Sequence, residues 1–424
     1  MTPPAQSSPV WHPFTQHALT PEFPLVSRGE GVWLETDLKN QTGGRLLDAI
    51  SSWWVITHGH RHPKIVEAIK AQADQLDQAI FANLTHQPAE DVASELIRIA
   101  PRGLSHAFFS DSGSTSVEVA LKMALGFWKH TGNPRTKIIA LEHAYHGDTV
   151  GTMSPGARGV FTSAYAPLLF DVVRLPFPHA GREQQTLDML KDAARDAAAL
   201  IVEPLILGSG GMLMYPPEVL RALAIICRRN GALFIADEVM TGFGRTGTMF
   251  ACKQAGVSPD ILCLAKGLTG GSLPLAATLC TPEIFLAHYS QDRSRTFFHS
   301  SSFTANPIAC AAARANLEIW RSEPVMERIA GLCAMQEERL ARFRAGSRFS
   351  DVRRLGTITA LDLKVPDPGY LAGIGPRMME FFLERGVLLR PLGNTIYVMP
   401  PYGITAAELD LVYDAIAAAA ENFT

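Results

Sequence analysis

The chain has 424 residues, 47% hydrophobic and 19% charged, and its 38 basic and 41 acidic side chains give a net charge of 38 − 41 = −3. This length allows one large core and a smaller one, so we expect two domains. The near-neutral charge excludes the electrostatic footprint of a protein that binds nucleic acid or an anionic membrane. Six scattered cysteines without a C-x-x-C pair indicate buried thiols rather than a disulfide or zinc framework.

The sequence also excludes a membrane protein. No apolar run is long enough to span a bilayer. Residues 1–6 lack the positive region and apolar stretch of a secretory signal. We therefore expect a cytoplasmic protein whose ligands are small molecules.

The first hundred residues change character near residue 62. Residues 1–60 are rich in Trp, Pro and Gly and predict short strands and loops. The pattern beyond them predicts helices over 64–79 and 88–100 and a short strand at 107–109. Thr115 and Glu118 then have the spacing of a capping box, which predicts the start of a strong helix.

Short apolar runs and helical stretches alternate through the middle of the chain. Helices are predicted over 184–198 and 217–229. Continuous apolar runs bounded by Gly, Pro or acidic residues are typical of parallel strands buried on both faces, and they occur at 138–141, 199–202, 232–236, 261–265 and 276–280. The alternation predicts an α/β fold with a mostly parallel sheet wrapped by helices.

The last hundred residues have a different pattern, which predicts a small α+β domain. Residues 308–346 are helix-like, and Thr405 and Glu408 cap a final amphipathic helix. Between them we expect strands at 357–363, 387–390 and 395–399 and a helix near 375–385. The predicted organisation is an N-terminal segment of the small domain (1–61), a large domain (62–318) and the C-terminal part of the small domain (319–424).

Asp237 and Lys266 are the first candidates for chemistry. Each follows an apolar, strand-like run, and the 29 residues between them suit a strand, a helix and a second strand. A lysine and an aspartate at neighbouring strand ends fit a pyridoxal phosphate site, in which the lysine forms the Schiff base and the aspartate keeps the ring nitrogen protonated. Taken alone, the pair would favour a surface ion pair.

Gly113 and Ser114 stand between a predicted strand and a helix N-terminus. Free backbone N–H groups and the helix dipole bind phosphate at such a position. A plain capped turn is the alternative.

Two further strand ends carry candidates. Tyr145 could stack on a planar cofactor ring, or it could be a partly buried loop tyrosine. Glu203 could bind the cofactor's phenolic side, hold an arginine or cap a helix. For Arg245 we favour a structural ion pair, and for the hydroxyls of residues 300–302 a helix N-cap before Pro307.

Together these motifs resemble the class III, fold type I, pyridoxal-phosphate-dependent aminotransferases. The strings D-S-G-S, Y-H-G, V-E-P, A-D-E-V-x-T-G-F-G-R-T-G and L-A-K-G-L-T-G-G begin at residues 111, 145, 202, 236 and 264. The resemblance covers essentially the whole chain. Residues 10–16, 51–54, 390–394 and 396–402 are similar to the adenosylmethionine–8-amino-7-oxononanoate aminotransferases of biotin biosynthesis within that class.

The resemblance implies a role for each matched residue. The cofactor, pyridoxal 5'-phosphate, would be held by Gly113, Ser114, Tyr145, Asp237, Lys266 and, from the partner subunit, Ser301 and Ser302. Catalysis would use Lys266, Tyr145 and Asp237. Substrate would be bound by Phe14, Trp53, Tyr145, Ser300, Arg390 and Tyr397. The Arg390 role also follows from chemistry, because a guanidinium fork is the natural ligand of a carboxylate.

The resemblance further implies a homodimer with active sites at the subunit interface. S-adenosylmethionine would donate an amine to 8-amino-7-oxononanoate, giving 7,8-diaminononanoate. The closest alternative is another class III ω-aminotransferase using lysine, a diamine or a β-amino acid. An aminomutase and a non-catalytic cofactor-binding protein are more distant alternatives. Residues 300–302 replace a more usual Gly-Pro-Thr but keep a hydroxyl for phosphate. Phe14 stands where a tyrosine is often found, which removes a hydroxyl from the pocket, so the donor stays open.

Overall fold

The computed structural model describes residues 8–20 and 22–424. Residues 1–6, on which the expectation of no secretory signal rests, lie outside the described residues. In the part that is described, no helix is both long and apolar enough to cross a membrane.

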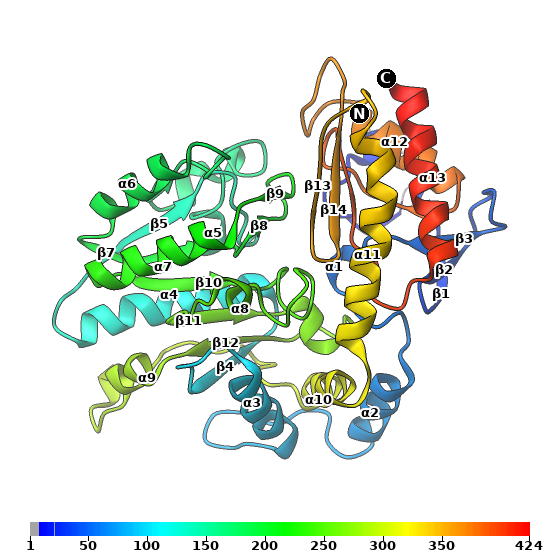
Figure 1. The fold of residues 1–424 in the computed structure, drawn as a ribbon. Coiled ribbons are helices and arrows are strands. Elements are labelled where there is room, and N and C mark those ends of the chain that lie inside the picture. Colours follow the sequence, from blue (N-terminus) through cyan, green and yellow to red (C-terminus); the bar gives the residue numbers. More distant parts are fainter. Residues whose placement is uncertain (1–7, 21) are drawn as a thin grey trace.

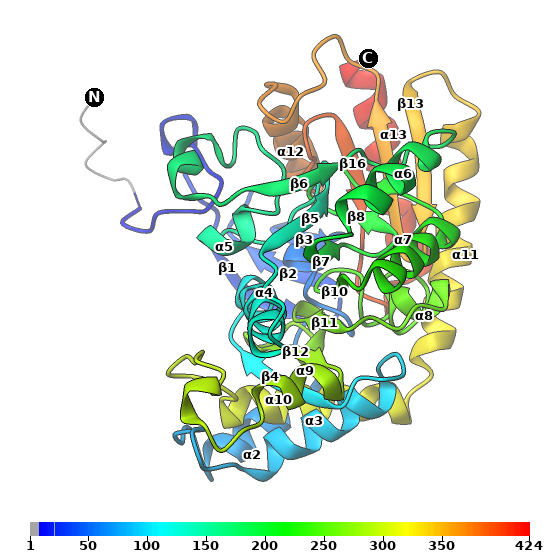
Figure 2. The same ribbon diagram turned by 90° about the vertical axis from the view of Figure 1, so that its left-hand side faces the viewer.

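A seven-stranded sheet forms the centre of the larger part of the molecule (Figure 1). Its strands lie in the order β4 (His106–Ser110), β12 (Ala276–Cys280), β11 (Ile261–Leu264), β10 (Leu233–Asp237), β7 (Ala197–Val202), β5 (Lys137–Leu141) and β6 (Val172–Leu175). Figure 2 shows this order from β6 at the top to β4 at the bottom. Only β12 runs antiparallel to its neighbours, so the predicted mostly parallel sheet is confirmed.

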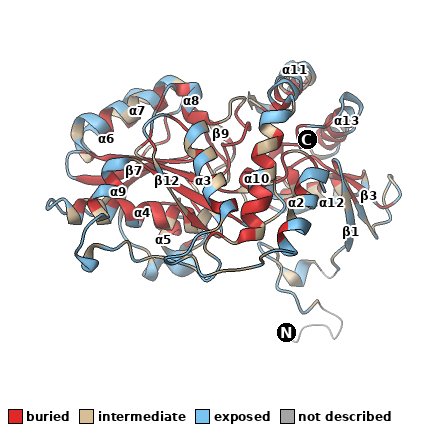
Figure 3. Ribbon diagram, turned by 90° about the horizontal axis from the view of Figure 1, so that it is seen from below, coloured by how far each residue is buried: buried red, intermediate tan, exposed pale blue. Residues whose placement is uncertain are grey.

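Helices cover both faces of this sheet. One face packs against α4 (Gly113–His130) and α9 (Pro282–His288). The other packs against α3 (Gln87–Ile99), α6 (Glu183–Ala193), α7 (Pro217–Asn230), α8 (Ala251–Ala255) and α10 (Pro307–Ser322). Residues 233–236 of β10 enter the two cores alternately, and all five residues of the strand are buried. Strands β7 and β12, which are labelled in Figure 3, are likewise buried along their length. This two-sided burial is why these strands read as continuous apolar runs.

A second core joins the two ends of the chain. A four-stranded sheet contains β1 (Val26–Glu30), β2 (Trp33–Thr36), β3 (Arg45–Asp48) and β15 (Val387–Leu388), and a three-stranded sheet contains β13 (Phe349–Leu355), β14 (Ile358–Leu363) and β16 (Thr395–Val398). Helices α11 (Val325–Arg344), α12 (Ile374–Glu384) and α13 (Ala406–Phe423) pack on this core. The domain boundaries at residues 61 and 318 stay a prediction.

Short elements complete the chain. They are α1 (Ser51–Trp54), α2 (Pro63–Ala73), α5 (Val150–Met153), β8 (Ile206–Leu207), β9 (Leu213–Met214) and the 3-10 turns η1 (His17–Leu19), η2 (Ser163–Leu168), η3 (Lys266–Thr269) and η4 (Arg293–Arg295). Helix α2 packs against α10 beneath the sheet (Figure 1).

Several local predictions from the sequence were wrong or incomplete. The helices predicted over 64–79 and 184–198 end earlier, at Ala73 and Ala193, and strand β13 was not predicted. Helix α4 begins at Gly113, and its capping box joins Ser112 to Thr115, whereas Glu118 accepts hydrogen bonds from Thr149 and the Gly151 backbone. The helix-like stretch 308–346 is two helices, α10 and α11, separated at residues 323–324. The edge strand β6 was missed because only its last residue is fully buried, so it shows no continuous apolar run.

The capping box of α13 predicts a measurable loss of stability in Thr405→Ala. Thr405 Oγ1 accepts from the Glu408 backbone N–H at 3.3 Å, and the Glu408 carboxylate accepts from the Thr405 N–H at 2.8 Å. We expect the free energy of unfolding to fall by about 1 kcal/mol, measured by urea denaturation. Thr405→Ser keeps the oxygen and should retain the stability. Equal stability of the alanine variant and the wild type would contradict the prediction.

Candidate active site

Asp237 and Lys266 lie at the same edge of the large sheet. Asp237 is the last residue of β10, and Lys266 is the second residue after β11. Asp237 lies beside Cys263 in the parallel pair of strands, so both carboxyl ends open toward one side. The two side chains line a common cavity of about 380 Å³. The structure therefore brings together the two residues that the sequence singled out.

The Lys266 amine is set up to lose its proton readily. Burial lowers the pKa of Lys266 to about 8, because little water remains to solvate the ammonium form. The negative charges of Asp237 and Glu203 oppose this shift, and the positive charge of Arg245 adds to it. The Nζ atom lies 4.7 Å from the centre of the Trp54 ring, which forms part of the cavity wall.

A buried histidine orients the Asp237 carboxylate. His146 Nδ1 lies 2.7 Å from Asp237 Oδ2, and Asp237 Oδ1 accepts from the Val239 N–H at 3.1 Å. The other ring nitrogen, His146 Nε2, is buried and has no partner among the described residues. Sequence reasoning gave His146 no role, although it directly follows Tyr145 at the end of a buried strand. The sequence signal that could have identified His146 was its place in the Y-H-G string that begins at residue 145.

The N-terminus of α4 forms another wall of the cavity. Gly113 and Ser114 both line it. A Cβ atom at Gly113 would come within 2.5 Å of Val239 Cγ1, so only glycine fits there without a shift of Val239. Ser114 Oγ accepts from the Asp148 N–H at 3.3 Å. Unpaired N–H groups at a helix start suit a phosphate.

These groups fit pyridoxal phosphate. The cavity contains an amine that can bond to an aldehyde and a carboxylate that can bind a protonated ring nitrogen. The start of a helix, with a glycine where a side chain would clash, is available for the phosphate. We therefore regard the chemistry of these residues as matched to the cofactor that the sequence indicated.

Tyr145 and Glu203 are joined through the backbone. Glu203 is buried, and its two oxygens accept from the N–H groups of Tyr145 and Gly208, both at 2.9 Å. Burial raises the pKa of Glu203 to about 7. Its oxygens are thus bound to backbone rather than to an arginine or a helix terminus, contrary to two of the roles considered. The Tyr145 hydroxyl donates to Asp148 Oδ2 at 2.8 Å, and burial raises its pKa.

A second cavity, of about 390 Å³, shares Tyr145, Trp54 and Lys266 with the first. Its wall contains Arg390, whose guanidinium carbon lies 5.0 Å from the Trp53 ring centre and 5.9 Å from that of Phe14.

Among the described residues, Arg390 forms no ion pair with a carboxylate. Tyr397 also lines the cavity, and its hydroxyl accepts from Trp54 Nε1 at 3.1 Å. A cation between aromatic rings, without an acidic partner in the described chain, is suited to bind a substrate carboxylate.

Phe161 and Tyr370 complete the aromatic wall of the second cavity. Their ring centres lie 4.6 Å apart, and Phe161 also meets Phe14 edge-on at 5.8 Å. Sequence reasoning missed both residues. They stand in loops that carry no motif, so only the folded chain could bring them to Arg390.

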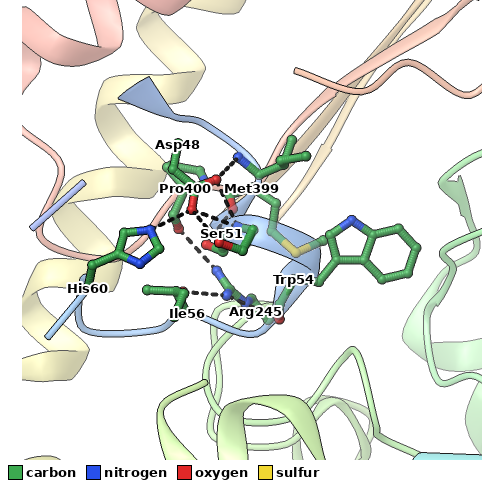
Figure 4. Close-up of polar contacts among 10 residues, drawn as sticks. Asp48, Ser51, Trp54, Ile56, His60, Arg245, Met399 and Pro400 are labelled. Carbon is green, nitrogen blue, oxygen red and sulfur yellow. Dashed lines mark hydrogen bonds and ion pairs between the residues drawn. The ribbon is translucent and has the colours of Figure 1, made fainter. Parts of the chain in front are cut away.

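Arg245 holds the segment that carries the two tryptophans (Figure 4). Its buried guanidinium donates to the carbonyls of Ile56 at 2.9 Å, Pro400 at 3.0 Å and Trp54 at 3.4 Å. The predicted structural role is supported, but the expected ion pair is replaced by carbonyl partners. Burial lowers the pKa of Arg245.

The same segment has an unusual backbone. Ser51, Ser52 and Trp54 have φ angles of 54°, 60° and 68°, in the left-handed region. Asp48 accepts from the Ser52 N–H and lies 2.8 Å from His60 Nε2, and Ser51 Oγ donates to the Met399 carbonyl at 2.8 Å (Figure 4). Non-glycine residues keep such angles only where the surroundings hold them.

The serines at 300–302 do not form part of the wall of either cavity, although Ser301 bonds to Asp111, which lines the first. Ser301 Oγ donates to Asp111 Oδ2, and the Ser302 carbonyl accepts from Gln78 at 2.7 Å. The N-cap of α10 is Asn306, whose side chain accepts from the Ala309 N–H, so the serines do not cap that helix.

Comparisons with known proteins show which family the chain belongs to. The family model "Aminotransferase class-III" matches residues 15–420. A Synechococcus elongatus protein, adenosylmethionine-8-amino-7-oxononanoate aminotransferase, is 46% identical over 96% of this chain and 97% of its own length. The protein of that name from Nitratidesulfovibrio vulgaris is 42% identical over 95% of this chain and 78% of its length.

Solved structures of similar proteins have the same fold. The crystal structure of adenosylmethionine-8-amino-7-oxononanoate aminotransferase from Methanocaldococcus jannaschii is 36% identical, with a TM-score of 0.92 over 98% of this chain and 97% of that one. A PLP-bound amine transaminase from an uncultivated Pseudomonas species is 34% identical, with a TM-score of 0.91 over 99% of each chain. With these matches over nearly its whole length, the chain belongs to the class III aminotransferases, and it is an enzyme that transfers amino groups with pyridoxal 5'-phosphate.

Proposed function

We propose that this enzyme transfers an amino group from S-adenosylmethionine to 8-amino-7-oxononanoate, which gives 7,8-diaminononanoate for biotin synthesis. The names of its relatives in Synechococcus and Methanocaldococcus support this reaction. The single structural observation that carries it is Arg390, a cation between Phe14 and Trp53 in a cavity that reaches Lys266. Such a group suits a keto acid whose carboxylate lies away from the reacting carbon.

Each residue of the first cavity has a proposed task. When bound, the cofactor supplies an electron sink for the negative charge that develops at the substrate carbon. Lys266 bonds to the cofactor at rest and, once released, moves a proton at the substrate carbon as general base and acid. Asp237, oriented by His146, keeps the ring nitrogen protonated. Gly113 and Ser114 bind the phosphate, and Tyr145 packs against the ring.

The second cavity is the proposed substrate site. Arg390 binds the acceptor's carboxylate, and Trp53, Phe14 and Tyr397 form the apolar and hydroxyl-bearing wall around its chain. Ser300 is also proposed to reach substrate. This role and the phosphate contact proposed for Ser301 and Ser302 would be made across a subunit interface.

We further propose a cytoplasmic homodimer with two active sites at its interface. In this arrangement, the large domain (62–318) holds the cofactor, and the small domain (1–61 and 319–424) closes the substrate side. Residues 300–302 do not line either cavity of their own chain, so the contacts proposed for them require the partner subunit.

The amino donor is tested by spectroscopy of the purified enzyme. S-adenosylmethionine, lysine and alanine are added separately, without keto acid, while the absorption band of the lysine-bound cofactor is followed. We expect only S-adenosylmethionine to convert that band to the amine form of the cofactor. Conversion by lysine or another amine instead would favour the alternative ω-aminotransferase and would remove the proposed donor.

Arg390→Ala should weaken use of the keto acid without loss of the cofactor. Loss of charged hydrogen bonds worth about 2–3 kcal/mol predicts a fall of about 30- to 150-fold in kcat/KM for 8-amino-7-oxononanoate. The cofactor absorption spectrum should be unchanged. Arg385→Ala is a matched control, because that arginine also lies over an aromatic ring but does not line either cavity. An unchanged kcat/KM in Arg390→Ala would exclude the proposed carboxylate site.

The pKa of Lys266 predicts the pH dependence of cofactor attachment to the apoenzyme. Only the neutral amine attacks the aldehyde, and with a pKa of about 8 it is protonated at lower pH. The attachment rate should therefore be nearly constant above about pH 9 and fall about tenfold per pH unit well below pH 8. Stopped-flow absorbance measures this rate, with Lys266→Ala as the variant that should not attach. An attachment rate that still rises through pH 10 would show that the pKa of Lys266 is not lowered and would contradict the prediction.

A further inference from the structure

The turn that carries Lys266 is held by a side chain that does not line either cavity. Lys266 has a φ of 46°, in the left-handed region, and begins the short turn η3. The carbonyls of the next two residues, Gly267 and Leu268, each accept a hydrogen bond from Asn316 Nδ2 at 2.9 Å. Asn316 lies in α10 and has no exposed surface. One buried amide group therefore holds two consecutive peptide units directly after the lysine.

His58 fixes the direction of that amide. Both carbonyls can only accept, so the amide nitrogen must face them and Asn316 Oδ1 must face His58 Nε2, which lies 2.9 Å away. His58 Nε2 therefore carries the proton. Burial lowers the pKa of His58 to about 3, so the ring stays neutral above that pH. Its other nitrogen, Nδ1, is buried and has no partner among the described residues.

The Lys266 turn also packs directly on the segment after the tryptophans. Gly270 and Gly271 have φ angles of 66° and 90°, and a Cβ at Gly271 would come within 2.6 Å of the Val55 carbonyl. A Cβ at Gly270 would come within 3.2 Å of Asn316 Oδ1. The Thr57 N–H donates to the Gly270 carbonyl at 3.4 Å. The lysine turn is therefore closely packed against both the pocket wall and Asn316.

We propose that Asn316, oriented by His58, is a positioning residue for Lys266: it fixes the backbone from which the amine enters the cavity. The inference rests on the proposed role of Lys266. Asn316 touches neither cavity, so its effect passes through the carbonyls of Gly267 and Leu268. Release of this clamp lets the turn relax, which moves Nζ away from the place where it transfers a proton.

Asn316→Asp tests the proposal in the holoenzyme with almost no change of volume. A carboxylate in place of the amide would face two carbonyl oxygens, whereas a protonated acid could still donate one hydrogen bond. The charged groups around Lys266 are Asp237, Glu203 and Arg245. Those near His58 are His62, Glu323 and Arg328. All stay unchanged in the variant.

We expect two results. The pH at which the absorption band of the lysine-bound cofactor titrates should shift by about one unit or more. The kcat should fall by about 10- to 100-fold while KM for the keto acid changes little. The kcat should recover partly as pH falls and the new acid is protonated. Asn316→Ala, which cannot regain a donor, should show no such recovery.

Gln336→Glu is the matched control. Gln336 is also a fully buried amide that donates to a backbone carbonyl, that of Thr357, at 3.2 Å, but it lies in α11, does not bond to the Lys266 turn and lines neither cavity. It should lower the melting temperature without shifting the cofactor titration. Equal shifts in both variants, or a wild-type titration in Asn316→Asp, would overturn the proposal.

A second pair of variants serves if Asn316→Asp does not fold. His58→Gln keeps a donor toward Asn316 and should retain most of the wild-type titration, whereas His58→Leu should shift it; equal behaviour of the two would overturn the proposal. Borohydride reduction of the wild-type enzyme and peptide mapping test the role of Lys266 separately. A label on another lysine would refute the proposed active site, whatever the Asn316 variants show.

Discussion

The site depends on the parallel pairing of β10 and β11. Because Asp237 lies beside Cys263 in that pair, the carboxylate and the Lys266 amine emerge at the same sheet edge. Both strands are buried on their two faces, so the charges sit where little water can reach them. That burial lowers the pKa of Lys266 to about 8 and raises that of Glu203 to about 7. Burial within the fold therefore brings the pKa of the Lys266 amine nearer to physiological pH than that of an exposed lysine.

Arg245 couples this sheet edge to the substrate wall. It stands eight residues after Asp237 and donates to the carbonyls of Ile56, from the N-terminal part of the chain, and Pro400, from the C-terminal part. A buried guanidinium is costly unless its donors are used, and here backbone carbonyls supply the acceptors. Arg245 also donates to the Trp54 carbonyl, whereas Asp48 and Met399 bind Ser52 and Ser51, so that these contacts together hold the left-handed backbone at Ser51, Ser52 and Trp54. Trp54 then lies over Lys266, so the wall of the substrate cavity is built from a strained segment that the large sheet keeps in place.

The parts of the fold and site that the sequence predicted are those encoded by local patterns. Buried strands, the alternation with helices and the strand-end residues Asp237 and Lys266 all follow from short apolar runs. His146, Phe161 and Asn316 could not be found in this way, because their importance comes from partners 91, 147 and 49 residues distant in the chain, respectively. The start of α4 was misplaced because both Ser112 and Thr115 can cap a helix, and only the folded backbone selects between them.

The cofactor groups and the substrate wall come from different parts of the chain. Asp237 and Lys266 lie at the ends of β10 and β11 and Gly113 starts α4, whereas Phe14, Trp53 and Arg390 come from segments nearer the two chain ends. Among the described residues, the two cavities share Trp54, Val55, Tyr145 and Lys266. Substitutions in the wall can therefore alter the substrate while the chemistry of the sheet edge is kept. This separation explains why an amine transaminase and an adenosylmethionine-8-amino-7-oxononanoate aminotransferase can match the chain almost equally well in fold, with TM-scores of 0.91 and 0.92. The choice of amino donor is therefore made by the side chains of the second cavity, around Arg390, and not by the fold.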